Sequence, residues 1–447
     1  MASTYLTRTY GNATSRRKCT ISFWIKKGFS GDTQQPYCSY ADNNNRFQLY
    51  FESTDELSIY NKDNGSDTIY LKTKAKYRDP NAWYHIYASV DTTLSTAGDR
   101  VKIYVNGERV TEFNASQNIP NQNSDLSFGN NAFTFNLGRY GGTGHHVNGI
   151  LSHFYFIDGS VVAHTEFGST DSTTGEWKIS TNPTISDFGN EGCKLFIDNN
   201  SVTDQSGKGN NMTVAAGTLT KTEDNPSNIF ATWNPLNNYY SQSTFANGNT
   251  KVTMGSSQYT YNTSTLGMTS GKWYAEFKQG SGGSDSMYGI SSTQATSTSA
   301  ELGNYPNDYG YYQADGKIWS NNSYVVNPYG ATWSAGDIIG VAVDLDNNKL
   351  YFSKNGTWQN SGDPTSGSTG TGAVSITAPA STSLGAYFFG FSDYWGAGSS
   401  STEANFGNGY FGTTAVSSAG TNASNLGIFE YDVPTGYTAL STKGLNE

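Results

Sequence analysis

Two aspartates in the second half of the sequence could form a catalytic carboxylate pair. Asp344 and Asp346 stand two residues apart, so on one strand they would share a face. A glycosidase needs two carboxyl groups roughly 5–9.5 Å apart, flanking a sugar bond. The run Asp344-Leu-Asp-Asn-Asn348 also has the composition of a turn, because Asp and Asn side chains bond to nearby backbone groups. We favour the turn.

Other residue combinations give no clearer sign of catalysis. Glu52, Asp55 and Glu56 flank a second expected hairpin turn. The adjacent histidines His145 and His146 would point to opposite faces of a strand, and no nearby Cys or carboxylate completes a metal site. No Gly-x-Ser-x-Gly elbow and no phosphate-binding loop before a helix is present. We therefore predict no catalytic residue, no metal ligand and no enzyme activity.

Aromatic residues offer a different chemistry, which is recognition. Tyr394 and Trp395 lie among glycines and serines in Phe391-Ser-Asp-Tyr-Trp-Gly-Ala-Gly398, and Tyr309, Tyr311 and Tyr312 crowd a second stretch. Tyrosine and tryptophan give a large contact area at low entropic cost and stack on sugar or apolar faces. Many of these rings could instead fill a core. The five residues named are the candidate ligand-binding residues.

The elements that must position these residues are strands. Apolar residues alternate with polar ones, and we find no segment of about ten residues with helical apolar spacing. Asn106-Gly107 and Asn355-Gly356 follow strand pairs and favour type I′ hairpins. Strands separated by turn signals indicate β-sandwiches. The clearest predicted strands cover residues 20–25, 46–51, 83–90, 101–105, 133–137, 150–157, 271–277, 338–343, 349–352 and 386–391.

Composition and charge exclude several partner classes. The chain has 447 residues and a formal net charge of −10, and a negative surface repels phosphate backbones and anionic lipid. The first five residues lack the pattern of a secretory signal, and no run approaches the roughly 18 apolar residues of a membrane span. The three cysteines, Cys19, Cys38 and Cys193, indicate buried free thiols. We expect neither nucleic-acid binding nor membrane insertion.

Several runs of the first half form a recognisable pattern: Cys19-Thr-Ile-Ser-Phe-Trp-Ile-Lys26, Lys102-Ile-Tyr-Val-Asn-Gly107, Phe156-Ile-Asp-Gly159 and Asp204-Gln-Ser-Gly207 with Asn210. In these runs the first half resembles LamG-type, concanavalin-like jelly-roll modules of phage particle proteins. Cys19 departs from the pattern, which has an aromatic residue there. Some LamG modules bind calcium through loop carboxylates. The resemblance therefore leaves calcium open at Asp42 or Asp158.

The second half has a pattern of its own, in the runs Gly271-Lys-Trp-Tyr-Ala-Glu-Phe277, Gly336-Asp-Ile-Ile-Gly-Val-Ala-Val-Asp344, Leu350-Tyr-Phe-Ser-Lys-Asn-Gly356 and Pro434-Thr-Gly-Tyr437. In these runs it resembles a SPRY domain, a family that binds partners through loops at one end of its sandwich. We predict an all-β chain of two antiparallel jelly-roll or concanavalin-like β-sandwiches. Residues 1–165 form the LamG-like sandwich, 166–224 a partly ordered bridge with short strands, and 225–447 the SPRY-like sandwich.

The order LamG-like then SPRY-like implies a structural protein of a bacteriophage virion. We expect a tail fibre, another appendage or a capsid-surface component that contacts other virion proteins as a homo-oligomer, with a trimer as the first expectation. Host-surface glycan is a further expected ligand, held by sandwich loops. Two alternatives remain: a polysaccharide depolymerase acting on host glycans, and an intracellular SPRY-type protein-binding module.

Overall fold

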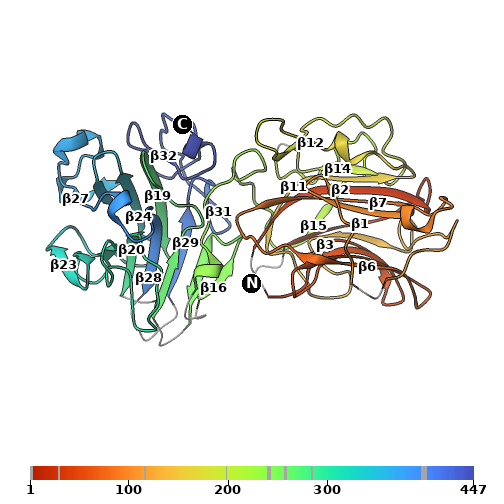
Figure 1. Cartoon of the computed structure of the whole chain (residues 1–447), viewed down its shortest axis with the longest axis horizontal. Helices are drawn as coiled ribbons and strands as arrows, with labels where there is room; N and C mark the ends of the chain where they lie inside the picture. Colours follow the sequence, from red (N-terminus) through yellow and green to blue (C-terminus); the bar gives the residue numbers. More distant parts are fainter. Residues whose placement is uncertain are drawn as a thin grey trace. The chain divides into compact units, whose positions relative to one another are not determined.

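The computed structural model describes residues 4–28, 31–114, 117–197, 199–238, 243–255, 259–282, 285–393 and 400–446. The chain separates into two compact units, Met1–Lys221 and Thr222–Glu447. Each unit is built from strands and short 3₁₀ turns (Figure 1). The all-β fold class predicted from period-two patterning is confirmed.

The first unit stacks two antiparallel sheets, which we call sheet A and sheet B (Figure 1). Sheet A has the order β15 (Thr213–Ala216), β1 (Tyr5–Thr9), β10 (Thr134–Leu137), β3 (Gln34–Asp42), β4 (Asn45–Phe51), β5 (Glu56–Asp63), β6 (Ser66–Lys76). Sheet B has the order β14 (Cys193–Leu195), β11 (Gly149–Asp158), β2 (Lys18–Lys27), β7 (Trp83–Asp91), β8 (Val101–Val105), β9 (Glu108–Arg109). The 3₁₀ turns are η1 (Ala97–Asp99) and η2 (His164–Glu166).

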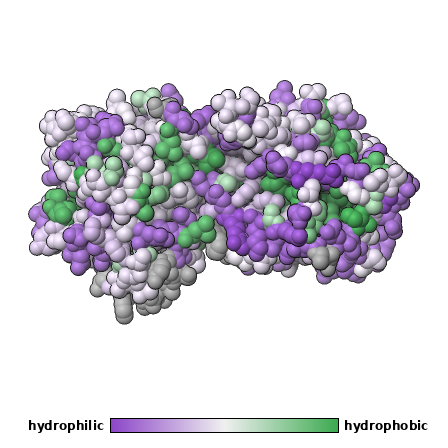
Figure 2. Space-filling model, viewed as in Figure 1, coloured by the Kyte–Doolittle hydropathy of each residue, from purple (hydrophilic) through white to green (hydrophobic). Residues whose placement is uncertain are grey.

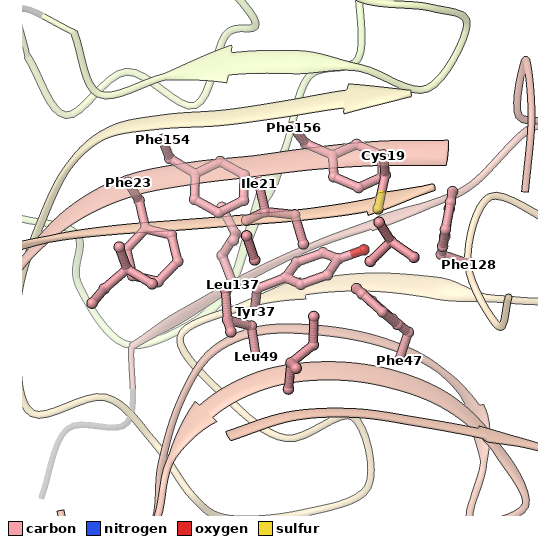
Figure 3. Close-up of a cluster of buried hydrophobic side chains, with 14 of the residues drawn as sticks. Cys19, Ile21, Phe23, Tyr37, Phe47, Leu49, Phe128, Leu137, Phe154 and Phe156 are labelled. Atoms are coloured by element: carbon pink, nitrogen blue, oxygen red, sulfur yellow. The ribbon is translucent and has the colours of Figure 1, made fainter. Parts of the chain in front are cut away.

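Alternate residues of these strands form the core between the sheets. Figure 3 shows Phe23, Phe154 and Phe156 from sheet B facing Tyr37 and sheet A, all of them fully buried. The Oη atoms of Tyr10 and Tyr37 are hydrogen-bonded at 2.7 Å, which satisfies both hydroxyls inside an otherwise apolar core. Cys19, where the family pattern has an aromatic ring, points into this core beside these rings (Figure 3).

The stretch expected to be a bridge is built into the first unit. Its strand β14 pairs with β11 of sheet B, and β15 pairs with β1 of sheet A. Before both of them in the sequence stands a separate hairpin of β12 (Gly168–Thr170) and β13 (Trp177–Ile179). Residues 166–221 therefore extend the first sandwich, because the open edges of both sheets offer them hydrogen-bond partners.

The second unit also stacks two sheets, sheet C and sheet D. Sheet C has the order β16 (Ser243–Ala246), β17 (Lys251–Met254), β29 (Ser401–Asn405), β19 (Lys272–Gln279), β24 (Ile338–Asp344), β25 (Lys349–Lys354), β26 (Thr357–Trp358), with β27 (Val374–Ser375) on β25 and β32 (Thr438–Ala439) parallel to β19. Sheet D has the order β18 (Thr260–Thr263), β28 (Phe388–Asp393), β20 (Ser286–Ser291), β21 (Tyr309–Tyr312), β22 (Ile318–Ser320), β23 (Ser323–Val326). The smaller elements are β30 (Tyr410–Phe411), β31 (Thr414–Ala415), η3 (Pro235–Asn237), η4 (Gln359–Ser361), η5 (Pro364–Thr369), η6 (Pro379–Ser381) and η7 (Gly444–Asn446).

The two Asn-Gly hairpins form as predicted. Asn106 and Gly107 have φ of 49° and 78°, and Asn355 and Gly356 have φ of 47° and 78°. Positive φ at both central residues is the requirement of a type I′ turn, which asparagine and glycine tolerate at little cost. These turns set the register of β8 with β9 and of β25 with β26.

The face of the molecule in Figure 2 carries mainly residues of hydrophilic or intermediate hydropathy. In the view of Figure 2, apolar side chains of the first unit gather in a band between hydrophilic rims, where the edge of its sheet stack faces the viewer. Within the described residues, no helix is long and apolar enough to cross a membrane.

Candidate functional site

The two candidate catalytic aspartates build a turn. Asp344 is fully buried and accepts hydrogen bonds from the backbone N–H of Asn347 at 3.0 Å and from its Nδ2 at 2.8 Å. Lys272 Nζ lies 3.1 Å from the same carboxylate. Asp346 accepts the N–H of Gly271 at 2.9 Å. Both carboxylates are occupied in closing the β24–β25 end of sheet C, as the turn interpretation expects.

The acidic residues Glu52, Asp55 and Glu56 of the first half likewise belong to a turn and its flanking strands. The N–H of Asp55 donates to the carbonyl of Glu52 at 2.9 Å, and the Asp55 carboxylate pairs with Lys27. Glu52 accepts from Ser58 Oγ at 2.7 Å, and Glu56 lies 3.7 Å from Lys72 Nζ. These partners hold each carboxylate in a structural contact.

A serine and a histidine meet inside the first unit, but the proton lies on the wrong nitrogen for catalysis. Ser22 Oγ is 2.9 Å from His85 Nε2, and Trp177 Nε1 donates to His85 Nδ1 at 3.0 Å. An indole N–H can only donate, so Nδ1 carries the lone pair and Nε2 carries the hydrogen. His85 therefore donates to Ser22 and cannot remove its proton, and both side chains are buried.

The calcium candidates are engaged in backbone contacts. Asp158 is buried and its carboxylate accepts the N–H groups of Thr14, Ser15 and Glu191. Asp42 accepts the N–H of Asn44 at 2.7 Å, within a turn. No group of three or more His, Cys, Asp or Glu side chains suited to a metal ion occurs among the residues that the structure describes.

The Asp-x-Ser-Gly motif, Asp204 to Gly207, fixes a loop through hydrogen bonds to the Asp204 carboxylate. Asp204 Oδ1 accepts the N–H groups of Lys194 and Ser206 at 2.9 and 2.8 Å. Its Oδ2 accepts Ser206 Oγ at 2.7 Å and the N–H of Asn210 at 2.9 Å. Four donors converge on one nearly buried carboxylate, which fixes the chain beside β14.

Replacing this carboxylate by an amide is expected to weaken the first unit. In Asp204→Asn the new NH₂ group faces donors, so at least one buried N–H loses its acceptor, and we expect a loss of about 2 kcal/mol in unfolding free energy. Hydrogen exchange of first-unit peptides measures it. Asp125→Asn, which only removes an exposed ion pair with Arg17, is the control. Equal protection in both variants would show that the hydrogen bonds to Asp204 contribute nothing to the stability of the first unit.

The outer face of sheet A carries a continuous row of rings around one guanidinium, which we call the tyrosine strip: Tyr40, Arg46, Tyr60, Tyr70 and Tyr140. Phe47, Leu49 and Ile59 point into the core, so strand alternation turns Arg46 and Tyr60 to the opposite face. Register places Tyr40 opposite Arg46 and Tyr60 opposite Tyr70. Thus strands β3 to β6 each contribute one member.

The members of the tyrosine strip touch one another. The Arg46 Cζ atom lies 5.1 Å from the ring centroid of Tyr60 and 5.9 Å from that of Tyr140. Ring centroids are 5.3 Å apart for Tyr40 and Tyr140 and 6.0 Å apart for Tyr60 and Tyr70. Burial and the hydrogen bond to Asp67 raise the pKa of Tyr60 to about 12, so its hydroxyl stays protonated. All five side chains remain partly exposed.

Comparison with known families agrees with the division of the chain into two β-sandwiches. A family model described as the concanavalin A-like lectin/glucanases superfamily matches residues 2–165, and a SPRY domain model matches residues 239–375. The chain joins a LamG-like, concanavalin-like domain to a SPRY domain. The tyrosine strip lies in the LamG-like domain.

Individual relatives match short parts of the chain. Over 87 residues the chain is 38% identical to Ran-binding protein 9 of Xenopus tropicalis and 37% identical to Ran-binding protein 10 of Danio rerio. These matches cover 19% of this chain and only 16% and 14% of the relatives. Among solved structures, the SPRY domain of human HERC1 is 15% identical with a TM-score of 0.31, covering 38% of this chain and 96% of that one. A SAP-like pentraxin of Limulus polyphemus is 18% identical with a TM-score of 0.28, covering 37% and 74%.

The candidate aromatic residues of the SPRY domain have varied positions. Tyr394 and Trp395 lie outside the described residues. Tyr311 is fully buried, and Tyr309 is 7% exposed; both belong to the core between sheets C and D. Tyr312 points to the other side of sheet D, half-buried, and its Oη donates to Asp285 at 2.6 Å. Alternation along β21 explains this division, since neighbouring residues face opposite sides.

Sequence reasoning missed the tyrosine strip because its members are far apart in the chain. The only local signal was the polar half of each alternating strand, such as Arg46 and Gln48 on β4 or Tyr60 and Lys62 on β5. Which of these positions become neighbours depends on strand order and register, and neither is written in a local pattern.

Proposed function

We propose that this protein is a non-enzymatic structural and binding component of a bacteriophage particle, displayed on a tail appendage or the capsid surface. The phage setting rests on the Phe156-Ile-Asp-Gly159 and Asp204-x-Ser-Gly207 pair in a LamG-like domain followed by a SPRY domain. Its binding role is carried by one observation, the tyrosine strip on the outer face of sheet A. Rings of this kind suit adhesion to a host-surface glycan.

A binding role also fits how the carboxylates are used. Asp344, Asp346, Asp158 and Asp204 are each committed to hydrogen bonds within the fold. A depolymerase needs two carboxyl groups free to flank a sugar bond. The depolymerase alternative predicts release of reducing ends from host polysaccharide, and that assay separates the two functions.

Locating the chain in purified virions tests the proposal. Cryo-electron microscopy or antibody labelling should find it in the particle. Copies at an exposed tail tip would favour adhesion, and copies tiled on the head or within a collar would favour an architectural role. Absence from the particle would remove the phage proposal and leave the intracellular SPRY-type module as the alternative.

A further inference from the structure

Arg46 is the one strip residue with a charge, and its charge is not neutralised. Its Nε donates to Gln48 Oε1 at 3.0 Å and its Nη1 to the carbonyl of Asn43. Among the described residues, no carboxylate lies within ion-pair distance of its guanidinium. The lysines on the same face do have carboxylate partners: Lys62 with Asp67, Lys72 and Lys76 with Glu56, and Lys74 with Glu112. A half-buried cation without a counter-ion favours an anionic ligand.

The distribution of charge along the chain supports an anion at this place. The first unit holds 20 Lys and Arg against 21 Asp and Glu, a formal charge of −1. The second unit holds 7 against 16, a formal charge of −9. The net charge of −10 therefore belongs almost entirely to the second unit. Repulsion of an anion from the LamG-like domain is correspondingly small.

The rings beside Arg46 are held in place before any ligand arrives. Asn43 Oδ1 accepts the hydroxyls of Tyr140 at 2.7 Å and of Tyr40 at 3.2 Å, and Asp67 accepts that of Tyr60. Fixed rings lose little conformational entropy on binding. Partly exposed tyrosine rings can pack against the CH groups of sugar rings.

The side chains between the rings favour a glycan over a protein partner. The outward positions of β4 to β6 around the strip carry Arg, Gln, Tyr, Ser and Lys, together with the ion-paired carboxylates Glu56 and Asp67, and no aliphatic residue. Protein–protein hot spots are instead centred in fully desolvated, well-packed pockets. Amide and hydroxyl side chains can hydrogen-bond to the hydroxyl groups of a sugar, and the tyrosine rings between them can pack against its CH groups.

We infer that the tyrosine strip binds an acidic polysaccharide, with sugar rings against Tyr60 and Tyr140 and a carboxylate or sulfate of the glycan paired with Arg46. This inference rests on the proposed adhesion role and names its ligand class. Arg46 selects acidic over neutral glycans, because a neutral sugar leaves the guanidinium without a counter-charge.

Binding of the full chain to three polymers tests the inference: alginate as a polyuronate, dextran as a neutral glycan and polyglutamate as an anionic peptide. Alginate should bind and dextran should bind at least about tenfold more weakly. Arg46→Gln should weaken alginate binding about tenfold or more, since a charge-assisted bond contributes about 1.5–3 kcal/mol. Tyr60→Leu should weaken it while leaving the preference for alginate over dextran.

Matched controls separate the site from general effects. Lys317→Gln removes the cation 5.1 Å from Tyr324, a similar cation–ring pair that belongs to the second unit, and should leave binding unchanged. Hydrogen exchange shows whether each variant is folded, and Tyr70→Leu at the end of the strip replaces any variant that is not. Equal binding of dextran, equal binding of polyglutamate, or unaltered binding by Arg46→Gln would each overturn the inference. None of these results bears on whether the chain is in the virion, which the labelling experiment decides separately.

Discussion

Lowering the pH from about 7.5 to about 5 is expected to raise the unfolding free energy of the second unit. Burial raises the pKa of Glu276 and of Asp308 to about 7 each. The folded unit therefore binds protons that the unfolded chain releases, so stability is lost as the pH rises through about 7 and regained in mild acid. For one such group the gain is at most about 3 kcal/mol, since each pKa unit corresponds to about 1.4 kcal/mol.

The pKa of Glu276 is raised because the loss of solvation on burial outweighs the hydrogen bonds that its carboxylate accepts. Glu276 on β19 accepts the N–H groups of Glu430 and Tyr431 at 2.8 and 2.9 Å, and it also bonds to Tyr274 and Asn405. These donors lower its pKa, but the side chain is completely buried, and burial penalises the charge more.

Hydrogen exchange of second-unit peptides across this pH range, corrected for intrinsic exchange, measures the effect. Glu276→Gln cannot titrate, so its stability should change less with pH than that of the wild type. Glu403→Gln keeps Glu276 and removes only the partly exposed pair with Lys251, 2.9 Å apart, so the full pH dependence should remain. If the stability of the wild-type second unit stays constant or falls on acidification, the prediction is wrong.

The first unit should respond to acid in the opposite direction through His85. Burial, with a smaller contribution from His164, lowers the pKa of His85 to about 3. The folded unit holds this ring neutral while the unfolded chain protonates it, so stability is lost as the pH falls below about 6.5. The loss attributable to His85 should approach about 3 kcal/mol at pH about 4.

Protonation at His85 has a specific structural cost. A second ring hydrogen would sit on Nδ1, which now accepts the indole N–H of Trp177 at 3.0 Å. The ring is also enclosed, with Trp24 stacked at 5.0 Å and Trp177 at 5.9 Å between centroids. Acid should therefore first loosen the β12–β13 hairpin that carries Trp177.

The test compares the acid sensitivity of the wild type with that of His85→Gln. First-unit protection should fall between pH about 6.5 and 4 in the wild type and fall less in the variant. His145→Gln alters an exposed loop and should behave as the wild type. The same acid sensitivity in all three proteins would mean that His85 is not responsible.

Local sequence patterns determined the strands and their turns. Alternation of apolar and polar residues fixes which side of a strand enters a core, as for Phe47 and Leu49 on β4, because successive side chains leave opposite faces. Asn106-Gly107 and Asn355-Gly356 determined their hairpins, since few other pairs accept positive φ at both positions. The two-sandwich architecture and the absence of regular helices among the described residues followed from these signals.

Tertiary structure alone decided which residues meet. Strands β14 and β15 look like fragments of a polar bridge, and they become parts of sheets B and A only because those sheets have edges to receive them. Tyr311 and Tyr312 are alike in sequence, but the register of β21 puts one in the core and the other outside. Tyr40, Arg46, Tyr60, Tyr70 and Tyr140 span a hundred residues and form one surface because non-local pairing sets their order, and local propensity carries no information about such pairing.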